Sequence, residues 1–291
     1  MDLDPDLAAL RPLGGFFVLR TTGPAGAAPS RPLPTLADAY DDTRPDGAPE
    51  PGGVTRPGDD AIQDGVTRPG GDAAPDGVRK PEDVTRPDAH GSPLAFRVGV
   101  VARRLRAPEP RVCASIAQQG LAARLWSVAL GCAALYGGVP DLDPRLLRWD
   151  PDAAAPDDLW LTEVRALPAT AAALTDTVLH GHLRPLGEAL RARYGTAAGL
   201  LWGNAGAALA GAARELDRWA RGSGRGDVAD RARALTAELF AHPPLSATGV
   251  FTAAAFRRRS CCLYYRVPGG GICGDCCFTR PPRPAPPAAP G

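Results

Sequence analysis

The sequence predicts a mainly α-helical fold: an α+β single domain with a few short strands, a disordered repeat insertion and a cysteine-rich C-terminal motif. Three observations lead to this prediction. Apolar residues recur at helical spacing through residues 94–250. Residues 26–93 instead repeat a 12-residue unit rich in proline, glycine and aspartate. Five of the seven cysteines lie within residues 261–277.

The composition limits the classes of function. The 291 residues carry a formal net charge of +1, which gives no electrostatic reason to expect a nucleic-acid partner. No apolar run reaches the roughly 18–20 residues of a membrane span. The acidic start, residues 1–6, lacks the basic and apolar regions of a signal peptide. We therefore expect a cytoplasmic protein without a membrane span, either free or peripheral to the inner face of the membrane.

The N-terminal segment differs in character from the insertion that follows it. Residues 1–25 contain an apolar run bounded by glycines, Gly15–Arg20, which predicts a strand. In residues 26–93 the pentapeptide Gly53–Pro57 recurs as Gly65–Pro69. Each repeat holds a single valine, too little apolar surface to offset the entropy of ordering the chain. We expect this insertion, like the proline-rich tail 281–291, to be disordered.

The helical body is expected to span residues 94–250. The predicted helices are 94–105, 113–136, 174–190 with an entry or kink around Pro185, 196–221 and 228–242, and a strand is predicted at 159–164. The helix at 113–136 is apolar almost all round in its second half, which predicts the central buried helix and places Cys132 in the core. Asn204 is a candidate buried polar anchor.

Some polar and aromatic residues of the body are open to two interpretations. Gln118, Gln119 and Arg124 lie on an otherwise buried helix, where they either cap loop carbonyls or contact a substrate. Arg124 is therefore a candidate site residue, and Trp126 is either core or the apolar wall of a docking site. His180 and His182 are two residues apart and point away from each other on a helix. We expect both at surface or capping positions.

The C-terminal cysteines follow the pattern Cys-Cys-x10-Cys-x2-Cys, formed by Cys261, Cys262, Cys273 and Cys276. Buried cysteines would be scattered at helix or strand spacing, and disulfides among so few residues would be strained. Metal ligation is the preferred interpretation. Two adjacent thiolates suit a two-iron core better than a single ion, so an iron–sulfur cluster is favoured and zinc is the alternative.

The residues around these cysteines predict further features. Gly274 can supply a positive φ in the knuckle Cys273–Cys276, and Gly269–Gly271 lets the main chain approach a cluster closely. We expect the four sulfur atoms to converge on one pocket and residues 263–267 to be extended. Arg257–Arg259 is either a contact for an acidic redox partner or anionic substrate, or a solvated run.

These residues also resemble a known family. Ser260–Arg266, followed by Pro268–Gly270 and Cys273–Cys276, is similar to the C-terminal signature of FhuF-type ferric siderophore reductases. Upstream, Gln118–Trp126 and Leu200–Asn204 resemble the actinobacterial branch of that family. The resemblance covers residues 94–279, and residues 1–25 weakly. It departs at Cys277, where relatives often carry proline, which leaves a fifth thiol beside the site.

The resemblance implies a [2Fe-2S] cluster on Cys261, Cys262, Cys273 and Cys276 and the reduction of a ferric siderophore. Hydroxamate and catecholate oxygens are hard ligands that hold Fe(III) better than Fe(II), so one electron weakens the complex enough for iron to leave. Tyr264, Tyr265 and Arg266 either line the approach to the cluster or serve in packing.

Because no flavin or nicotinamide motif is evident, a separate ferredoxin or NAD(P)H-dependent reductase is expected to supply the electron. Two alternatives from other classes stay open. One is a zinc-stapled helical interaction module. The other is a cluster-bearing electron carrier or sensor that has no siderophore substrate.

Overall fold

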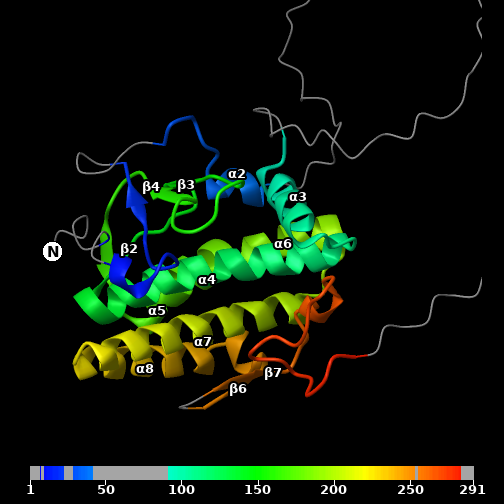
Figure 1. The fold of residues 1–291 in the computed structure, drawn as a ribbon. Helices are drawn as coiled ribbons and strands as arrows, with labels where there is room; N and C mark the ends of the chain where they lie inside the picture. The colour runs from blue at the N-terminus through cyan, green and yellow to red at the C-terminus, as the bar shows by residue number, and fades with distance from the viewer. Residues whose placement is uncertain (1–6, 8–9, 23–28, 42–90, 253–254, 283–291) are drawn as a thin grey trace, which may run out of the picture.

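The computed structural model describes residues 7, 10–22, 29–41, 91–252 and 255–282. It is mainly α-helical, as predicted, with long helices lying side by side and short strands around them (Figure 1). The helices are α2 (Leu36–Tyr40), α3 (Pro93–Leu105), α4 (Pro110–Tyr136), α5 (Ala171–Leu174), α6 (Arg184–Tyr194), α7 (Ala198–Gly222) and α8 (Gly226–Ala241). The strands are β1 (Arg20–Thr21), β2 (Gly138–Pro140), β3 (Leu147–Trp149), β4 (Leu159–Leu161), β5 (Ala166–Pro168), β6 (Gly249–Phe251) and β7 (Phe256–Arg258).

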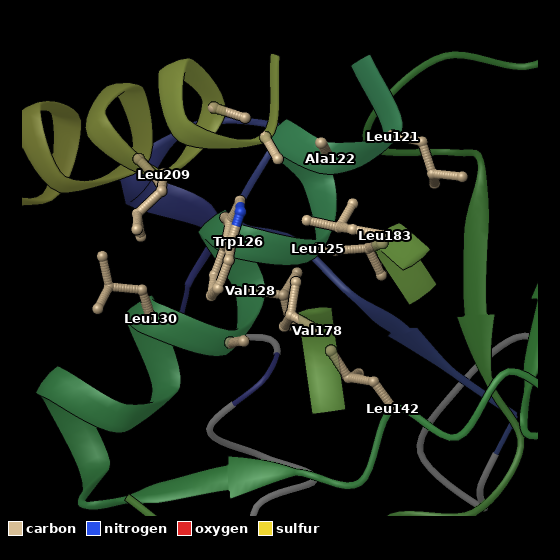
Figure 2. Close-up of a cluster of buried hydrophobic side chains, with 14 of the residues drawn as sticks. Leu121, Ala122, Leu125, Trp126, Val128, Leu130, Leu142, Val178, Leu183 and Leu209 are labelled. Atoms are coloured by element: carbon tan, nitrogen blue, oxygen red, sulfur yellow. The ribbon is translucent and has the colours of Figure 1, made fainter. Parts of the chain in front are cut away.

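The core is built around α4 and α7, which pack along each other, while α3 contacts α4 and α8 contacts both (Figure 1). Helix α4 buries residues on every side, as its apolar sequence predicts, and Cys132 is fully buried. Figure 2 shows Leu209 of α7 on one side of α4 and Val178 and Leu183 on the other. The helix begins earlier than predicted, with Pro110 in its first turn, where the missing N–H of proline has no intrahelical partner to lose.

The strand predicted at Gly15–Arg20 is wrong. The amide of Phe17 donates to the carbonyl of Gly14 in a turn, and only Arg20–Thr21 forms a strand, which pairs with β4 in parallel. Phe17 is buried against α4, where a Cβ added at Gly131 would lie 3.0 Å from its ring. The apolar run therefore indicated burial under a helix, not membership of a sheet. The other predicted strand forms as β4, over the first half of 159–164.

The expected boundary of the insertion at residue 26 is also wrong, because residues 29–41 fold onto the body. Thr35 caps α2 in a capping box with Asp38, and Leu36 and Tyr40 of this helix are buried. The amide of Trp149 donates to the carbonyl of Pro34 at 2.9 Å. The predicted repeats lie within residues 42–90 and the tail beyond residue 282, both outside the described residues.

The helix predicted around Pro185 is divided into three parts. Helix α5 continues into a π-helical stretch, Thr175–Leu183, and α6 begins at Arg184 with Pro185 in its first turn. His182 lies in the π-helical stretch and is fully buried, so of its two expected positions, surface or capping, the surface position is wrong. Its Nδ1 lies 2.7 Å from the hydroxyl of Tyr40 in α2, and its Nε2 contacts the carbonyl of Leu142. His180 is exposed, as predicted.

The described helices include none with the length and hydropathy needed to cross a membrane.

Candidate metal centre

The cysteine motif follows a hairpin that lies on α7. Strands β6 and β7 pair antiparallel, and β7 leads directly into Ser260 and the cysteines. Two glycines of α7 permit the close approach. A Cβ at Gly206 would lie 3.3 Å from the ring of Phe256, and one at Gly203 would lie 2.1 Å from the hydroxyl oxygen of Ser260. That hydroxyl donates to the carbonyl of Gly199 at 2.8 Å, which fixes the chain immediately before the first cysteine.

The structure divides the thiols into two neighbouring groups. Cys262 and Cys273 lie close enough to interact, and their interaction lowers the pKa of Cys262 to about 7 and raises that of Cys273. Cys261 lies within electrostatic reach of Cys276 and Cys277, and burial raises its pKa. All seven cysteines of the chain are free of disulfides.

The prediction that all four sulfur atoms converge on one pocket is met only in part, because the sulfur atoms form two neighbouring groups. Across the described ranges, no three His, Cys, Asp or Glu side chains are grouped so as to hold a single metal ion. Cys262 with Cys273, and Cys261 with either Cys276 or its neighbour Cys277, supply the two pairs of cysteine ligands that the two irons of a [2Fe-2S] core take.

Main-chain amides point at two of the sulfur atoms. The amide of Leu263 donates to Sγ of Cys261 at 3.3 Å, and the amide of Phe278 donates to Sγ of Cys276 at 3.4 Å. Hydrogen bonds of this kind favour the thiolate and tune the reduction potential of a bound cluster. Both sulfur atoms belong to the predicted ligand set.

The loop between Cys262 and Cys273 is tightly folded, so the prediction that residues 263–267 are extended is wrong. Leu263 adopts a φ of 67°, and Tyr264–Arg266 forms a 3₁₀ turn. A Cβ at Gly270 would lie 2.5 Å from the carbonyl oxygen of Tyr264 and 2.8 Å from that of Val267. Glycine is therefore required at this position by the loop's own backbone. Gly274 does not have the predicted positive φ, and the knuckle closes through the amide of Cys276 donating to the carbonyl of Cys273 at 3.1 Å.

Arg258 lies at the centre of a buried polar network that joins the cysteine loop to α4 and α7. Its Nη2 donates to Oδ1 of Asn204, whose Nδ2 donates to Oγ of Ser115 at 3.0 Å. The hydroxyl of Ser115 in turn donates to the carbonyl of Cys262 at 2.8 Å. The backbone amide of Arg258 donates to the carbonyl of Asp275 in the knuckle at 3.0 Å. Asn204 is thus the buried polar anchor that the sequence indicated.

The charge of Arg258 supplies a test of whether an iron–sulfur cluster fits. Only 3% of this residue is exposed, and its Nε and Nη1 have no hydrogen-bond partner in the described structure. A buried cation left unpaired in this way is costly. Burial raises the pKa of both Cys261 and Cys277, and Arg258 opposes that effect. A cluster on cysteine thiolates is net anionic, because the thiolate and sulfide charges exceed those of two ferric ions. The donor set and the unpaired cation therefore both fit the group.

A second arginine forms an ion pair with the knuckle. Arg214 of α7 donates to both carboxylate oxygens of Asp275, at 2.9 and 3.3 Å. Sequence reasoning had treated Arg257–Arg259 as one run and missed the separate position of Arg258. Alternation along β7 is the signal that could have found it, since Arg257 and Arg259 are exposed while Arg258 points inward.

The three predicted approach residues lie beside the loop. Tyr264 is 40% exposed, and Tyr265 contacts Phe278 edge to face with ring centroids 6.1 Å apart. Nε of Arg266 donates to Glu109 at 2.6 Å, just before α4, so this arginine ties the loop to the body. Tyr264, Ile272 and Phe278 are among the few large apolar side chains exposed in the described structure.

Arg124 and Trp126 are placed differently, in the interior of the body. Arg124 is 1% exposed and pairs with Asp158 at 2.9 Å, while its Nη1 donates to the carbonyl of Gly15. Trp126 is fully buried in the core (Figure 2). Gln118 likewise donates to the carbonyl of Leu201. The structure therefore favours the capping and core interpretations, and neither Arg124 nor Trp126 lies on a surface that meets a ligand.

The fold and the site define a mainly helical iron–sulfur protein whose cluster motif follows the last helix. Comparison with protein families gives the particular class. The model of the FhuF 2Fe-2S C-terminal domain matches residues 258–278, and the model described as ferric iron reductase FhuF-like transporter matches residues 118–260. Together they span 118–278, more than half of the chain. The protein belongs to the FhuF-type ferric iron reductase family and carries a [2Fe-2S] cluster. A search of curated proteins finds no match.

Proposed function

We propose that this protein reduces the Fe(III) of a ferric siderophore to Fe(II) in the cytoplasm, with a [2Fe-2S] cluster held by Cys261, Cys262, Cys273 and Cys276. The observation that carries the proposal is the gathering of these thiols beside the buried, unpaired cation of Arg258. Family membership supports the reaction class, since one matching model is named for ferric iron reduction.

The position of the cysteines fits electron transfer to an outside complex. Cys261, Cys273 and Cys276 are half-buried, and Tyr264, Ile272 and Phe278 of the same segment are exposed. The bound cluster would supply one electron, which converts Fe(III) of the complex to Fe(II). Hard oxygen ligands hold Fe(II) weakly, so the iron then leaves. The electron would be replaced by a separate donor, a ferredoxin or an NAD(P)H-dependent reductase.

The test is reoxidation of the anaerobically reduced protein by ferric siderophores, followed by the cluster absorbance, with a ferrous chelator trapping released iron. One iron should be trapped for each cluster oxidised. The matching gallium complexes have the same shape and cannot accept the electron, so they should leave the cluster reduced. If no ferric siderophore oxidises the cluster while a ferredoxin does, the protein is an electron carrier and the proposal is wrong.

A further inference from the structure

The cysteine segment carries most of the large apolar side chains that the described chain leaves exposed. Of five such side chains, three belong to this segment: Tyr264, Ile272 and Phe278. The segment forms an outer edge of the molecule beside α7 and is drawn in orange and red (Figure 1). Exposed aromatic and aliphatic groups that occur together in this way are typical of surfaces that bind another protein.

Contacts within the segment place these side chains at the cysteine motif. The amide of Phe278 donates to Sγ of Cys276 at 3.4 Å, and the ring of Phe278 contacts that of Tyr265 edge to face. Ile272 directly precedes Cys273. A partner that covers these side chains would therefore come close to the cluster, as electron transfer between two proteins requires.

The charges of the segment point to an acidic partner. The whole chain has a net charge of only +1, yet residues 256–280 hold five arginines and a single acidic residue, Asp275. That carboxylate already pairs with Arg214 of α7 at 2.9 Å. Outside the segment, Glu109 accepts hydrogen bonds from Arg266 and from one further arginine, so it cannot neutralise both. The surface of the segment therefore keeps a net positive charge.

Arg257 and Arg259 supply this charge next to the cysteines. Both are exposed, whereas Arg258 between them is buried. Nη2 of Arg257 donates to the carbonyl of Cys277 at 3.4 Å, which places this guanidinium at the knuckle. In the described part of the chain neither Arg257 nor Arg259 has an ion-pair partner.

The exposed arginines of the long helices provide a contrast. Arg218 and Arg221 of α7 and Arg233 of α8 each pair with a carboxylate of their own or the neighbouring helix. An acidic partner would have to compete with those carboxylates. At the cysteine segment the charges of Arg257 and Arg259 are available.

We propose that Tyr264, Ile272 and Phe278, flanked by Arg257 and Arg259, form the docking surface of the electron donor, and that this donor is a one-electron carrier protein with an acidic surface around its redox group. This inference rests on the proposed function. On docking, the reduced donor would pass one electron to the oxidised cluster, with no bond formed or broken and no proton transferred. Opposite charges speed the encounter, and a small apolar centre lets the oxidised donor leave again.

The experiment mixes the oxidised, cluster-loaded protein anaerobically with an acidic flavodoxin in its hydroquinone form and follows the cluster and flavin absorbances by stopped flow. The parent should be reduced fastest at low ionic strength, and added salt should slow the reaction. R257Q/R259Q should be reduced roughly fivefold to tenfold more slowly at low salt and respond less to salt, because two exposed charges are lost. I272S should react roughly threefold more slowly and keep the salt dependence, because it removes only apolar contact.

Two controls separate docking from damage to the cluster. R145Q/R165Q removes two exposed arginines beside β3 and β2, away from β6 and β7 (Figure 1), and should react like the parent. A photoreduced deazaflavin, which is a small neutral reductant, should reduce every variant at the parent rate. Iron content and absorption spectra should be equal in all variants.

Reduction of R257Q/R259Q by the flavodoxin at the parent rate would overturn the inference, and so would a parent protein that reacts with the deazaflavin but not with the flavodoxin. Two other results would assign the surface to a different ligand and also overturn it. Slower reoxidation of R257Q/R259Q by ferric siderophores, with reduction unchanged, would indicate the substrate. Arginine-dependent binding to vesicles of anionic phospholipid, with reduction unchanged, would indicate a membrane.

These outcomes leave the proposed function intact if ferric siderophores still oxidise the cluster of the parent. Conversely, arginine-dependent reduction by the flavodoxin, without oxidation by any ferric complex, would support the docking surface and refute the reductase.

Discussion

The helical body and the cysteine segment are stabilised in different ways. In the body, α4 and α7 are lined by apolar side chains that are buried almost continuously. Among residues 256–278 only Phe256, Arg258, Cys262 and Val267 are buried. The segment depends instead on polar connections to the body, through Ser115, Asn204 and Arg214, and on the metal. Apolar burial therefore determines whether the body folds, while metal binding by the cysteines determines whether the cysteine segment reaches its final structure.

The largest expected effect falls on the segment. C273S should abolish or strongly alter the cluster, because serine oxygen matches these irons poorly compared with thiolate. C132S removes a core thiol and should retain the cluster, and so should C277S. Iron and sulfide content and the absorption spectrum of anaerobically purified protein measure this. Equal losses in C277S and C273S would mean that Cys277 is a ligand and that the predicted set is shifted by one residue.

Truncating a core side chain of the body should lower the stability of the protein and leave the cluster unchanged. L130A removes a fully buried side chain of α4 and should lower the free energy of unfolding by about 2–5 kcal/mol. The reduction potential of the cluster should stay at the parent value, because no contact of the cysteine loop is changed. Denaturant unfolding and redox titration of the same sample give the two quantities. A large change in potential would show that the two regions are not separable.

Acid should weaken the body through His182. Burial lowers the pKa of His182 to about 4, with the carbonyl of Leu142 and the carboxylate of Asp143 opposing the shift. The unfolded chain binds this proton at its ordinary pKa of about 6.5, so stability is full above pH 6.5 and falls between pH 6.5 and 4. The loss at pH 5 should be about 2 kcal/mol. H182Q should flatten this pH dependence of unfolding, while H180Q, an exposed neighbour, should keep it.

The smallest expected effect is a shift in the reduction potential of the cluster, and it tests the charge of Arg258 alone. R258Q removes the buried positive charge but leaves an amide that can still bond to Asn204. It should lower the reduction potential by about 60 mV, equivalent to about 1.4 kcal/mol for one electron, because the reduced cluster is the more negative state. R257Q changes the exposed neighbour on the opposite face of β7 and should shift the potential little. Equal potentials in the two variants would show that Arg258 only supports the loop.

The success of sequence reasoning differed between the two regions for a physical reason. The long helices were predictable because α4 and α7 carry apolar groups over many turns, although the start of α4 at Pro110 was missed. Most short segments were not predictable, although the strand β4 was. Gly15–Arg20 and α2 are held by contacts with distant residues, such as Phe17 at Gly131 and Tyr40 at His182, which no local pattern shows.

For the candidate site, the four cysteine ligands stay a prediction from the sequence, whereas the surroundings of these cysteines became visible only in the structure. The spacing of the four cysteines restricts the metal chemistry by itself. The roles of Ser115 and Arg258 depend on how the chain from β7 to Cys262 lies against α4 and α7, and that arrangement follows from the room left at Gly203 and Gly206. Arg124 was predicted as a candidate site residue because it is a lone arginine on an apolar helix. The structure shows that it instead forms an ion pair with Asp158.

The network from Arg258 through Asn204 and Ser115 to Cys262 has a consequence for the speed of electron transfer. Adding one electron to a site forces its surroundings to respond, and freely turning water makes that response expensive. Amide and hydroxyl groups that are buried and already bonded to one another cannot turn, so their dipoles are set before the electron arrives. On this side the site should have a small reorganisation energy, which allows fast transfer at a modest driving force.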